Sequence, residues 1–247
     1  MRLILCSDGD TTATWAYAHL RKLGCADLEL VTSEDLALAT QWSHRVQSDG
    51  SALDIKLKDG RCLAHASVDG VINRLNWPSR AHVAQATLED QDYAYSELFA
   101  FYLSWLHSLP GKVFNRATPQ GLSGSWRPPA QWALLAGQSG FTVAPYTESD
   151  TAWERPLPEG RTLTQIVVFE GKPFGAIETK DIEPQCRELF ARSKTSLLGL
   201  DLYRSEQGRW IFYNATTLPD LCVGGIPLLE EILKTWSLQA RSNEVTQ

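Results

Sequence analysis

The sequence predicts an α/β protein in which a parallel sheet near the N-terminus is followed by a region of mixed strands and helices. Three observations lead to this prediction. Short apolar runs at 2–6 and 28–31 flank a helical pattern at 13–23. A further apolar run at 69–75 precedes a long helical pattern at 89–107. The second half of the chain then alternates short apolar strands with helical patterns, and it shows no internal repeat.

The opening segment reads strand, helix, strand, helix. The run RLILC is followed by SDGDTT, a turn and capping cluster, and then by apolar residues at helical spacing. After the strand at 28–31, the cluster TSED starts the next helix, where Thr32 or Ser33 can cap the first turn. The acidic residues of that turn suit the helix dipole. Strands joined through helices in this way are expected to lie parallel.

The next segments predict a hairpin, a strand and a helix. ALDIKL and CLAHA flank Asp59-Gly60, a pair that favours a tight hairpin turn. DGVINRL at 69–75 reads as a buried strand. In the helical pattern at 89–107, apolar residues recur at i, i+4, i+7, i+8 and i+11, a stripe wide enough to dock on a sheet.

The second half contains shorter elements. A Gly/Ser/Pro-rich stretch, RATPQGLSGSWRPP, reads as a flexible connection, and the polar segment at 146–163 reads as a loop. Glu170-Gly171 marks the turn of a second hairpin. Strands are expected at 112–115, 141–145, 197–204 and 209–214, and helices at 129–139, 184–197 and 227–238.

Composition excludes two classes of function. The 247 residues carry a formal charge of −6, so the chain lacks the basic footprint of a nucleic-acid or anionic-membrane surface. Its apolar runs fall short of the roughly 20 residues that a membrane helix needs, and Asp8 comes too early for a signal peptide. The five cysteines show no metal-ligand spacing, so we expect reduced thiols, no zinc and a cytoplasmic location.

Four segments resemble the glutamate-ligase branch of the ATP-grasp superfamily, which includes peptide-tailoring ligases and macrocyclases. DGVINRL (69–75) is similar to the strand that closes the pre-ATP-grasp domain. Three blocks of the ATP-grasp domain resemble, in the correct order, PGKVFNRATPQGLSGSWRPPAQWALLAGQSGFTVAPY (110–146), LTQIVVFEGKPFGAI (163–177) and LLGLDLYRSEQGRWIFYNATTLPDL (197–221).

The resemblance implies two domains, the second of which lacks the family's nucleotide lid. Residues 1–108 would form a pre-ATP-grasp (Rossmann-like) parallel-sheet domain, and 109–247 a truncated ATP-grasp α+β domain. The family's central subdomain, which carries ATP lysines and a mobile lid, must fit between residues 146 and 163. Four strands and a helix need on the order of 50 residues, and this segment contains no lysine. We therefore expect a domain that lacks the nucleotide lid.

In active members of the family, ATP converts a carboxylate to an acyl phosphate, which an amine or hydroxyl then attacks. The resemblance places Asp201 and Asn214 at metal-ligand positions and Arg127 at a nucleotide-binding lysine position. Phe212 replaces the glutamate of the Glu-x-Asn motif, and an aromatic ring offers Mg²⁺ no oxygen. Gln165 or Thr164 stands where the family has an arginine that would neutralise the acyl phosphate.

Two arginines outside these blocks are candidates for substrate binding. Arg74 and Arg80 flank Asn76-Trp77-Pro78, and a guanidinium matches the geometry of a substrate carboxylate. Paired with local acids, the same two side chains would be structural.

These observations leave three hypotheses for function. The first is a catalytically degenerate homologue that needs no cofactor and binds a peptide, a carboxylate or a protein partner, such as an active ATP-grasp paralogue or a second copy of itself. The second is a minimal ATP-dependent carboxylate-amine ligase, in which Arg127, Asp201 and Asn214 hold ATP and Mg²⁺ with help from another subunit. The third is a small-molecule binder that uses the loop at residues 8–12.

Overall fold

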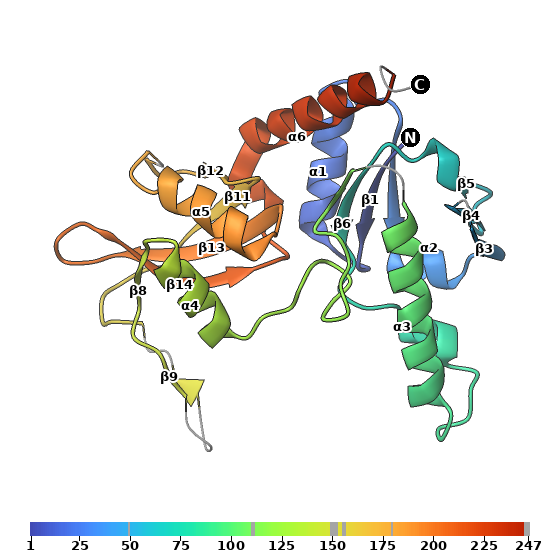
Figure 1. Ribbon diagram of the computed structural model, residues 1–247, viewed down its shortest axis with the longest axis horizontal. Coiled ribbons are helices and arrows are strands. Elements are labelled where there is room, and N and C mark those ends of the chain that lie inside the picture. The colour runs from blue at the N-terminus through green and yellow to red at the C-terminus, as the bar shows by residue number, and fades with distance from the viewer. Residues whose placement is uncertain (49, 110–111, 149–152, 155–156, 179, 245–247) are drawn as a thin grey trace. The chain divides into compact units, whose positions relative to one another are not determined.

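The computed structural model divides the chain into two compact units (Figure 1). The first comprises Met1–Ser125 together with Leu229–Gln247, and the second comprises Trp126–Leu228. The structure describes all residues except 49, 110–111, 149–152, 155–156, 179 and 245–247. The expected chain break at Pro110-Gly111 lies outside the described residues.

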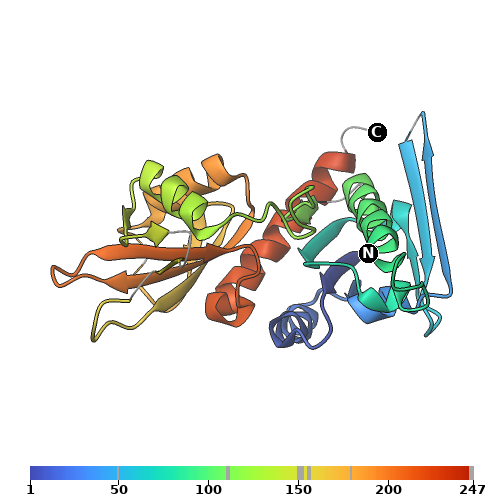
Figure 2. The same cartoon turned by 90° about the horizontal axis from the view of Figure 1, so that it is seen from below.

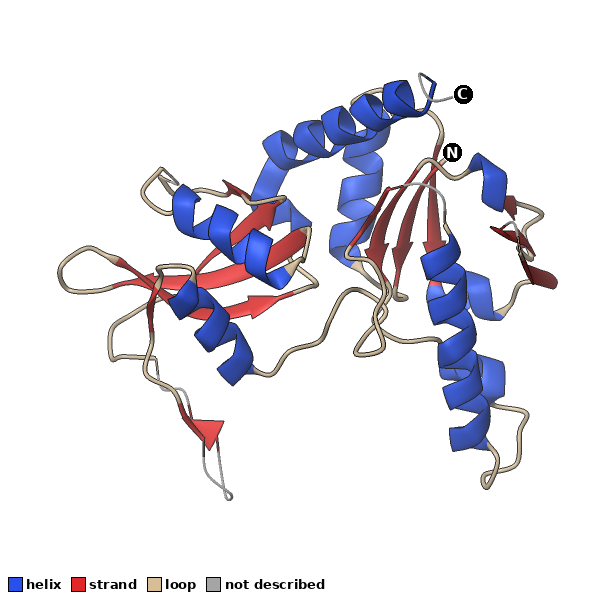
Figure 3. Cartoon of the chain, viewed as in Figure 1, coloured by secondary structure: helices blue, strands red, loops and turns tan. Residues whose placement is uncertain are grey.

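A four-stranded parallel sheet forms the centre of the first unit, in the order β2-β1-β6-β7 (Figure 3). These strands are β1 (Arg2–Cys6), β2 (Leu28–Thr32), β6 (Gly70–Arg74) and β7 (Lys112–Phe114), and each neighbouring pair is parallel. The prediction of an N-terminal parallel sheet is therefore confirmed.

The first two helices begin at side-chain caps. In α1 (Thr11–Lys22), the Asp10 carboxylate accepts a hydrogen bond from the Ala13 amide. In α2 (Ser33–Ala37), Thr32 and Asp35 form a capping box in which each side chain bonds the other residue's amide. Such caps satisfy amides that have no partner inside the helix. They explain why α1 begins at Thr11 and α2 at Ser33.

A small antiparallel sheet covers part of the first unit. It consists of β3 (Gln41–Gln47), β4 (Gly50–Lys56) and β5 (Cys62–Ala64), with two 3-10 turns, η1 (His65–Ser67) and η2 (Arg80–Val83), later in the chain. The hairpin of β4 and β5 was expected, but β3 was not, because its sequence QWSHRVQ is largely polar. The long helix α3 (Gln91–Ser108) shares one core with β4 and the central sheet.

A buried amide holds the loop after β7 to the parallel sheet. Asn73 Nδ2 donates to the carbonyl oxygens of Asn115 at 3.2 Å and Leu122 at 2.5 Å, and Asn73 Oδ1 accepts from the Leu75 amide. The stretch GLSGS is mostly buried as a result, rather than a flexible connection. This attachment explains why the first unit extends to Ser125, beyond the predicted domain end at residue 108.

The second unit is built on a five-stranded sheet in the order β12-β11-β13-β14-β8. Neighbouring strands of this sheet are antiparallel, except that the two-residue strand β8 runs parallel to β14. Helices α4 (Pro129–Gln138) and α5 (Glu183–Ser193) cover one face of this sheet (Figure 2). The strands are β8 (Thr142–Val143), β11 (Thr164–Phe169), β12 (Lys172–Phe174), β13 (Leu197–Arg204) and β14 (Trp210–Thr216).

Two segments differ from the sequence prediction. The expected loop at 146–163, part of which lies outside the described residues, contains a pair of two-residue strands, β9 (Thr147–Glu148) and β10 (Trp153–Glu154). The last helix, α6 (Leu221–Glu244), begins before its predicted start and is interrupted at Gly225, whose φ is 63°. No helix in the described part of the chain is long and apolar enough to cross a bilayer.

The C-terminal part of α6 packs on the parallel sheet of the first unit. The ring of Trp236 stacks on that of Phe114, with 5.8 Å between centroids, and Arg2 lies 5.7 Å from the same indole. A Cβ atom at Gly70 would fall 2.3 Å from Trp236 Nε1, so only glycine fits under the indole. This contact accounts for the membership of residues after Leu229 in the first unit.

Candidate functional site

The two faces of the second unit's sheet have different characters. On β13, Leu198, Leu200 and Leu202 pack into the core beneath α4 and α5. Side chains alternate between faces along a strand, so Asp201 and Tyr203 lie on the opposite face. Tyr203 packs there with Ile211 in a separate small cluster. The face opposite α4 and α5 therefore offers polar side chains beside an apolar patch.

Three polar residues form a row across this face, which we call the polar row: Gln165, Asp201 and Asn214. They are register partners on β11, β13 and β14, with Asp201 opposite both neighbours. Gln165 Nε2 donates a hydrogen bond of 2.9 Å to Asp201 Oδ1. The structure thus brings together the two predicted metal ligands and Gln165, which the resemblance names together with Thr164 as a candidate for the family's arginine position.

Phe212 does not face the polar row. A β-bulge lies between Asp201 and Leu202, so that Asn214 pairs with Asp201 while Phe212 pairs with Leu202. The Phe212 ring is fully buried in the core beneath the helices. A bulge inserts one extra residue and changes which side chains share a face. The sequence placed Phe212 at a ligand position, but it is a core residue on the other face.

The donors of the polar row do not fit a pair of magnesium ions. Mg²⁺ requires near-octahedral coordination by oxygen and is usually held through carboxylates. The row supplies one carboxylate and two amides, and one oxygen of that carboxylate already accepts from Gln165. Among the described residues, no cluster of three or more histidine, cysteine, aspartate or glutamate side chains could hold a metal ion. The assignment of Asp201 and Asn214 as metal ligands stays a prediction.

Cavities lie on both sides of the polar row. The smaller, about 20 Å³, is bordered by Gly199, Asp201 and Asp220 and has room for about one water. The larger, about 520 Å³, is bordered by Tyr203, Ile211 and Arg161, among others. Sequence reasoning missed Arg161, although it is one of the two arginines, and of the two basic residues, in the segment 146–163.

Arg127 lies apart from the polar row. Its Nη2 donates to the Ser193 carbonyl at 2.8 Å, its Nη1 approaches Thr195 Oγ1 at 3.4 Å, and its Cζ lies 4.9 Å from the centre of the Trp132 ring. Trp132 belongs to the core beneath the helices, so the Arg127 guanidinium lies on that side. Burial lowers the pKa of Arg127. The structure does not bring this predicted nucleotide ligand to Asp201.

Arg74 is committed to an ion pair inside the first unit. Its Nε donates to Asp10 Oδ2 at 2.8 Å and its Nη2 to Asp10 Oδ1 at 3.3 Å. Only 6% of the Arg74 side chain and 12% of the Asp10 side chain are exposed. Because Asp10 also caps α1, the pair fixes the helix start to the end of β6. The pairing with a local acid, which the sequence left open for Arg74, is therefore present.

Arg80 has a different environment. Its side chain is 66% exposed, lies 4.5 Å above the Tyr95 ring and approaches Asp92 at 3.9 Å. It is therefore available to an external carboxylate, whereas Arg74 is enclosed. Substrate binding by the two arginines stays a prediction.

The loop after β1 is occupied by groups of its own unit. Asp8 accepts hydrogen bonds from Ser33 Oγ at 2.7 Å and from the Glu34 amide at 3.0 Å. Burial alone would raise the pKa of Asp8, but these hydrogen bonds lower it. Together with the Asp10–Arg74 pair, they give the acidic side chains of this loop partners from the protein. The geometry gives no support to a small-molecule site at residues 8–12.

Comparisons with known proteins show which fold this architecture belongs to. No protein-family model matches the sequence, and no curated protein does. Among solved structures, the ATP-grasp ligase PsnB complexed with minimal precursor superposes with a TM-score of 0.68 at 12% identity, over 94% of this chain and 98% of PsnB. This chain has the ATP-grasp fold.

Two further ATP-grasp structures are similar to this chain. Macrocyclase MdnC from Microcystis aeruginosa MRC, bound with precursor peptide MdnA, gives a TM-score of 0.61 at 11% identity, over 88% of this chain and 91% of MdnC. A RiPP-associated ATP-grasp ligase of Chryseobacterium gregarium, in complex with ADP and a leader and core peptide, gives 0.60 at 10%, over 88% and 89%. The expectation of ATP-grasp architecture is confirmed, and at these identities the likeness concerns the fold.

Proposed function

We propose that this protein is an ATP-grasp-fold peptide binder that does not itself form an acyl phosphate. The observation that carries the proposal is the polar row, in which the neutral amide of Gln165 contacts Asp201. The resemblance places Gln165 or Thr164, neither of which is a cation, where the family has an arginine. The similar structures named above were obtained with precursor peptides. We extend peptide binding, but not catalysis, to this chain.

Charge on the face opposite α4 and α5 argues against phosphoryl transfer. Stabilising a transferring phosphoryl group needs cations, because negative charge concentrates on its oxygens. Of the side chains that border the two cavities beside the polar row, Arg161 is the basic one, and it approaches Glu206 at 3.7 Å. Asp201 and Asp220 add negative charge on the same face. The negative charge of a nucleoside triphosphate would be poorly neutralised on this face.

The short segment between β8 and β11 supports the same proposal. The part of residues 146–163 that the structure describes holds only the paired strands β9 and β10. We infer that the nucleotide lid of the family is missing and that the protein works without ATP or a metal. The ligand would be a peptide, a peptide carboxylate or a protein partner, including an active ATP-grasp paralogue or a second copy of this chain. None of the five cysteines forms a disulfide, which suits a cytoplasmic protein.

The proposal is tested by measuring ADP release. The full chain is mixed with Mg-ATP and a panel of amines and carboxylate peptides, and a coupled assay follows ADP. We expect no release above the no-enzyme rate. ADP production that depends on both substrates and disappears in Asp201→Asn would overturn the proposal.

Peptide binding needs its own measurement. A displayed library of random peptides is selected on the immobilised protein, and enriched sequences are synthesised and titrated by fluorescence anisotropy. We expect saturable binding to the folded chain and none to the chain unfolded in urea. Failure to enrich any peptide over the unfolded control would contradict the peptide-binding half of the proposal.

A minimal ligase is the second candidate, favoured by one observation. The sheet register places Asp201 directly opposite Asn214, so two predicted ligands do share a face. On this alternative, the ADP-release assay becomes positive, and Asp201→Ala lowers the rate at least about tenfold, equivalent to about 1.4 kcal/mol. The matched variant Asp220→Ala, at the rim of the small cavity, separates an effect of the polar row from one of surface charge.

A further inference from the structure

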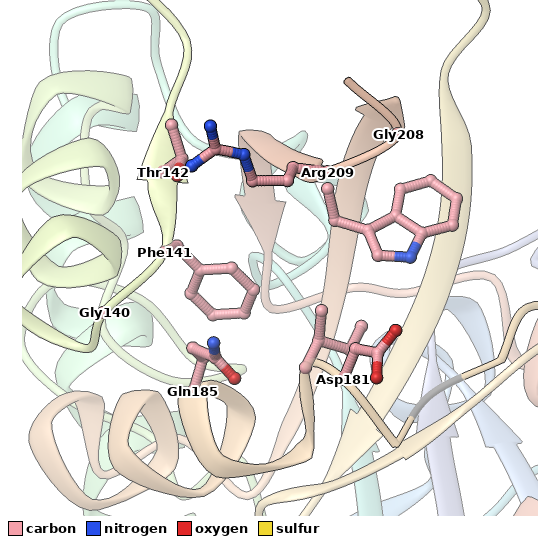
Figure 4. Close-up of a pocket in the computed structure, with 9 residues that line it drawn as sticks. Gly140, Phe141, Thr142, Asp181, Gln185, Gly208 and Arg209 are labelled. Atoms are coloured by element: carbon pink, nitrogen blue, oxygen red, sulfur yellow. The ribbon is translucent and has the colours of Figure 1, made fainter. Parts of the chain in front are cut away.

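A third cavity of the second unit lies away from the polar row (Figure 4). Its volume is about 330 Å³, at the lower end of the range for small-ligand sites. Three segments border it: the start of β8 with Phe141 and Thr142, the end of the β13–β14 turn with Arg209, and the start of α5 with Asp181 and Gln185. Each segment contributes a different chemical group.

Opposite charges border this cavity without pairing. Arg209 makes a hydrogen bond of 3.4 Å to the neutral Gln207, and Asp181 makes no ion pair with any residue that the structure describes. In Figure 4, the Arg209 guanidinium lies beside Thr142 on one side of the cavity, and Asp181 lies with Gln185 on the other. The protein therefore leaves a cation and an anion facing one space.

An apolar surface lies between the two charges. The Phe141 ring, which is largely buried, occupies the middle of the view between Arg209 and Gln185. The indole of Trp210 also borders the cavity, and Arg204 lies 4.5 Å above that ring, which supports its position. A ligand that spans the two charges would thus rest its middle on aromatic carbon.

We propose that this cavity binds a short zwitterionic peptide, with its carboxylate on Arg209, its ammonium group on Asp181 and an apolar side chain against Phe141. A guanidinium fork matches a carboxylate in geometry as well as charge. A single amino acid is too short, because its two charged groups share one carbon atom. Each added residue separates the termini by roughly 3.5 Å, so a dipeptide or tripeptide matches a site divided by an aromatic ring.

The proposal is tested by calorimetric titration of three ligands against the full chain. They are the dipeptide Ala-Phe, its N-acetyl derivative and its C-terminal amide. We expect Ala-Phe to bind, and each blocked form to bind at least about tenfold more weakly, since each loses one charge pair worth about 1.4 kcal/mol. Free phenylalanine should bind more weakly than Ala-Phe.

Two variants assign the ends of the peptide. Arg209→Gln should bind Ala-Phe and its amide equally, and Asp181→Asn should bind Ala-Phe and its acetyl derivative equally. Arg192→Gln is the matched control, because Arg192 is an exposed arginine of α5 that pairs with Glu188 and does not border the cavity. Both test residues are exposed, so circular dichroism should show unchanged folding.

Three results would overturn the proposal: no binding of Ala-Phe at about 10 mM, equal binding of the blocked forms, or discrimination that survives in both variants. These outcomes are independent of ADP release, because Arg209 and Asp181 do not border the cavities beside the polar row. Failure of this proposal is therefore distinguishable from failure of the proposed function.

Discussion

Asn73 shows how one side chain can define the end of a structural unit. Its amide satisfies two carbonyl groups of the loop at residues 115–125 and one amide of its own strand. An asparagine in an apolar strand gives no sequence signal of its partners, because those partners are backbone groups far along the chain. The predicted domain end at residue 108 missed this attachment for that reason.

Replacing Asn73 should destabilise the first unit. In Asn73→Ala, three buried backbone groups lose their partner, and each unsatisfied group costs about 1–3 kcal/mol. We expect the free energy of unfolding in urea to fall by about 3 kcal/mol. The exposed neighbour provides the control: Asn76→Ala should change it by less than about 0.5 kcal/mol. Equal effects of the two variants would contradict this account of the loop.

Arg74 and Arg80 provide a second test at the scale of single residues. Breaking a buried ion pair leaves an uncompensated charge, so Arg74→Gln should lower the unfolding free energy by about 3 kcal/mol or more. Arg80→Gln, at an exposed position, should change it by less than about 1 kcal/mol. Denaturant titration of both variants measures the difference. An Arg74→Gln protein as stable as the parent would argue that Arg74 serves a ligand and not the fold.

His82 should make stability depend on pH. Burial lowers the pKa of His82, whose Nε2 lies 2.9 Å from the Tyr102 hydroxyl. Because the folded state resists protonation, stability is retained above the ordinary histidine pKa of about 6.5 and falls as the pH drops below it. The loss of unfolding free energy between about pH 7.5 and 5 should be smaller in His82→Gln than in the parent. His107→Gln, at an exposed position, should show the same dependence of unfolding free energy on pH as the parent.

At the scale of elements, the spacing of apolar residues and the capping residues predicted most strands and helices. The parallel strands, the α1 and α2 caps and the hairpins around Asp59-Gly60 and Glu170-Gly171 are present as expected. β3 was not predicted because most of its residues are polar, although Trp42 packs against the core of the first unit. The bulge that moves Phe212 to the core was also invisible, because it depends on pairing with a neighbouring strand and not on local sequence.

Close packing of β13 against the end of β14 and the loop before α6 predicts the effect of replacing Gly199. A Cβ atom at Gly199 would lie 2.9 Å from Thr216 Cγ2 and 3.1 Å from Pro219 Cβ. Gly199→Ala should therefore cost about 1–3 kcal/mol of stability through overpacking.

Gly137 is the contrasting position. It lies inside α4, where a Cβ would meet only Val143 at 3.7 Å, so Gly137→Ala should stabilise the protein by up to about 1 kcal/mol. Thermal unfolding of both variants measures the two effects. If both variants shifted the melting temperature in the same direction, the packing described for β13 would be contradicted.

At the scale of the whole molecule, the order of motifs along the chain predicted the ATP-grasp fold, and the superpositions confirm it. The polar row was predictable in part, because the resemblance places Asp201 and Asn214 at metal-ligand positions and Gln165 or Thr164 at the position of the family's arginine. The cavity between Arg209 and Asp181 was not, since it joins a turn, a strand and a helix start that are distant in sequence. The order of motifs along the chain indicates the fold, whereas a cavity depends on how elements that are distant in sequence pack together.

Direct titration of the full chain with Mg-ATP tests the central claim, that this ATP-grasp fold does not hold a nucleotide. We expect no heat of binding at nucleotide concentrations up to about 1 mM, which excludes a binding free energy more favourable than about −4 kcal/mol. The same result is expected for Asp201→Ala. A micromolar affinity in the parent that Asp201→Ala abolishes would contradict the account and identify the polar row as a working nucleotide site.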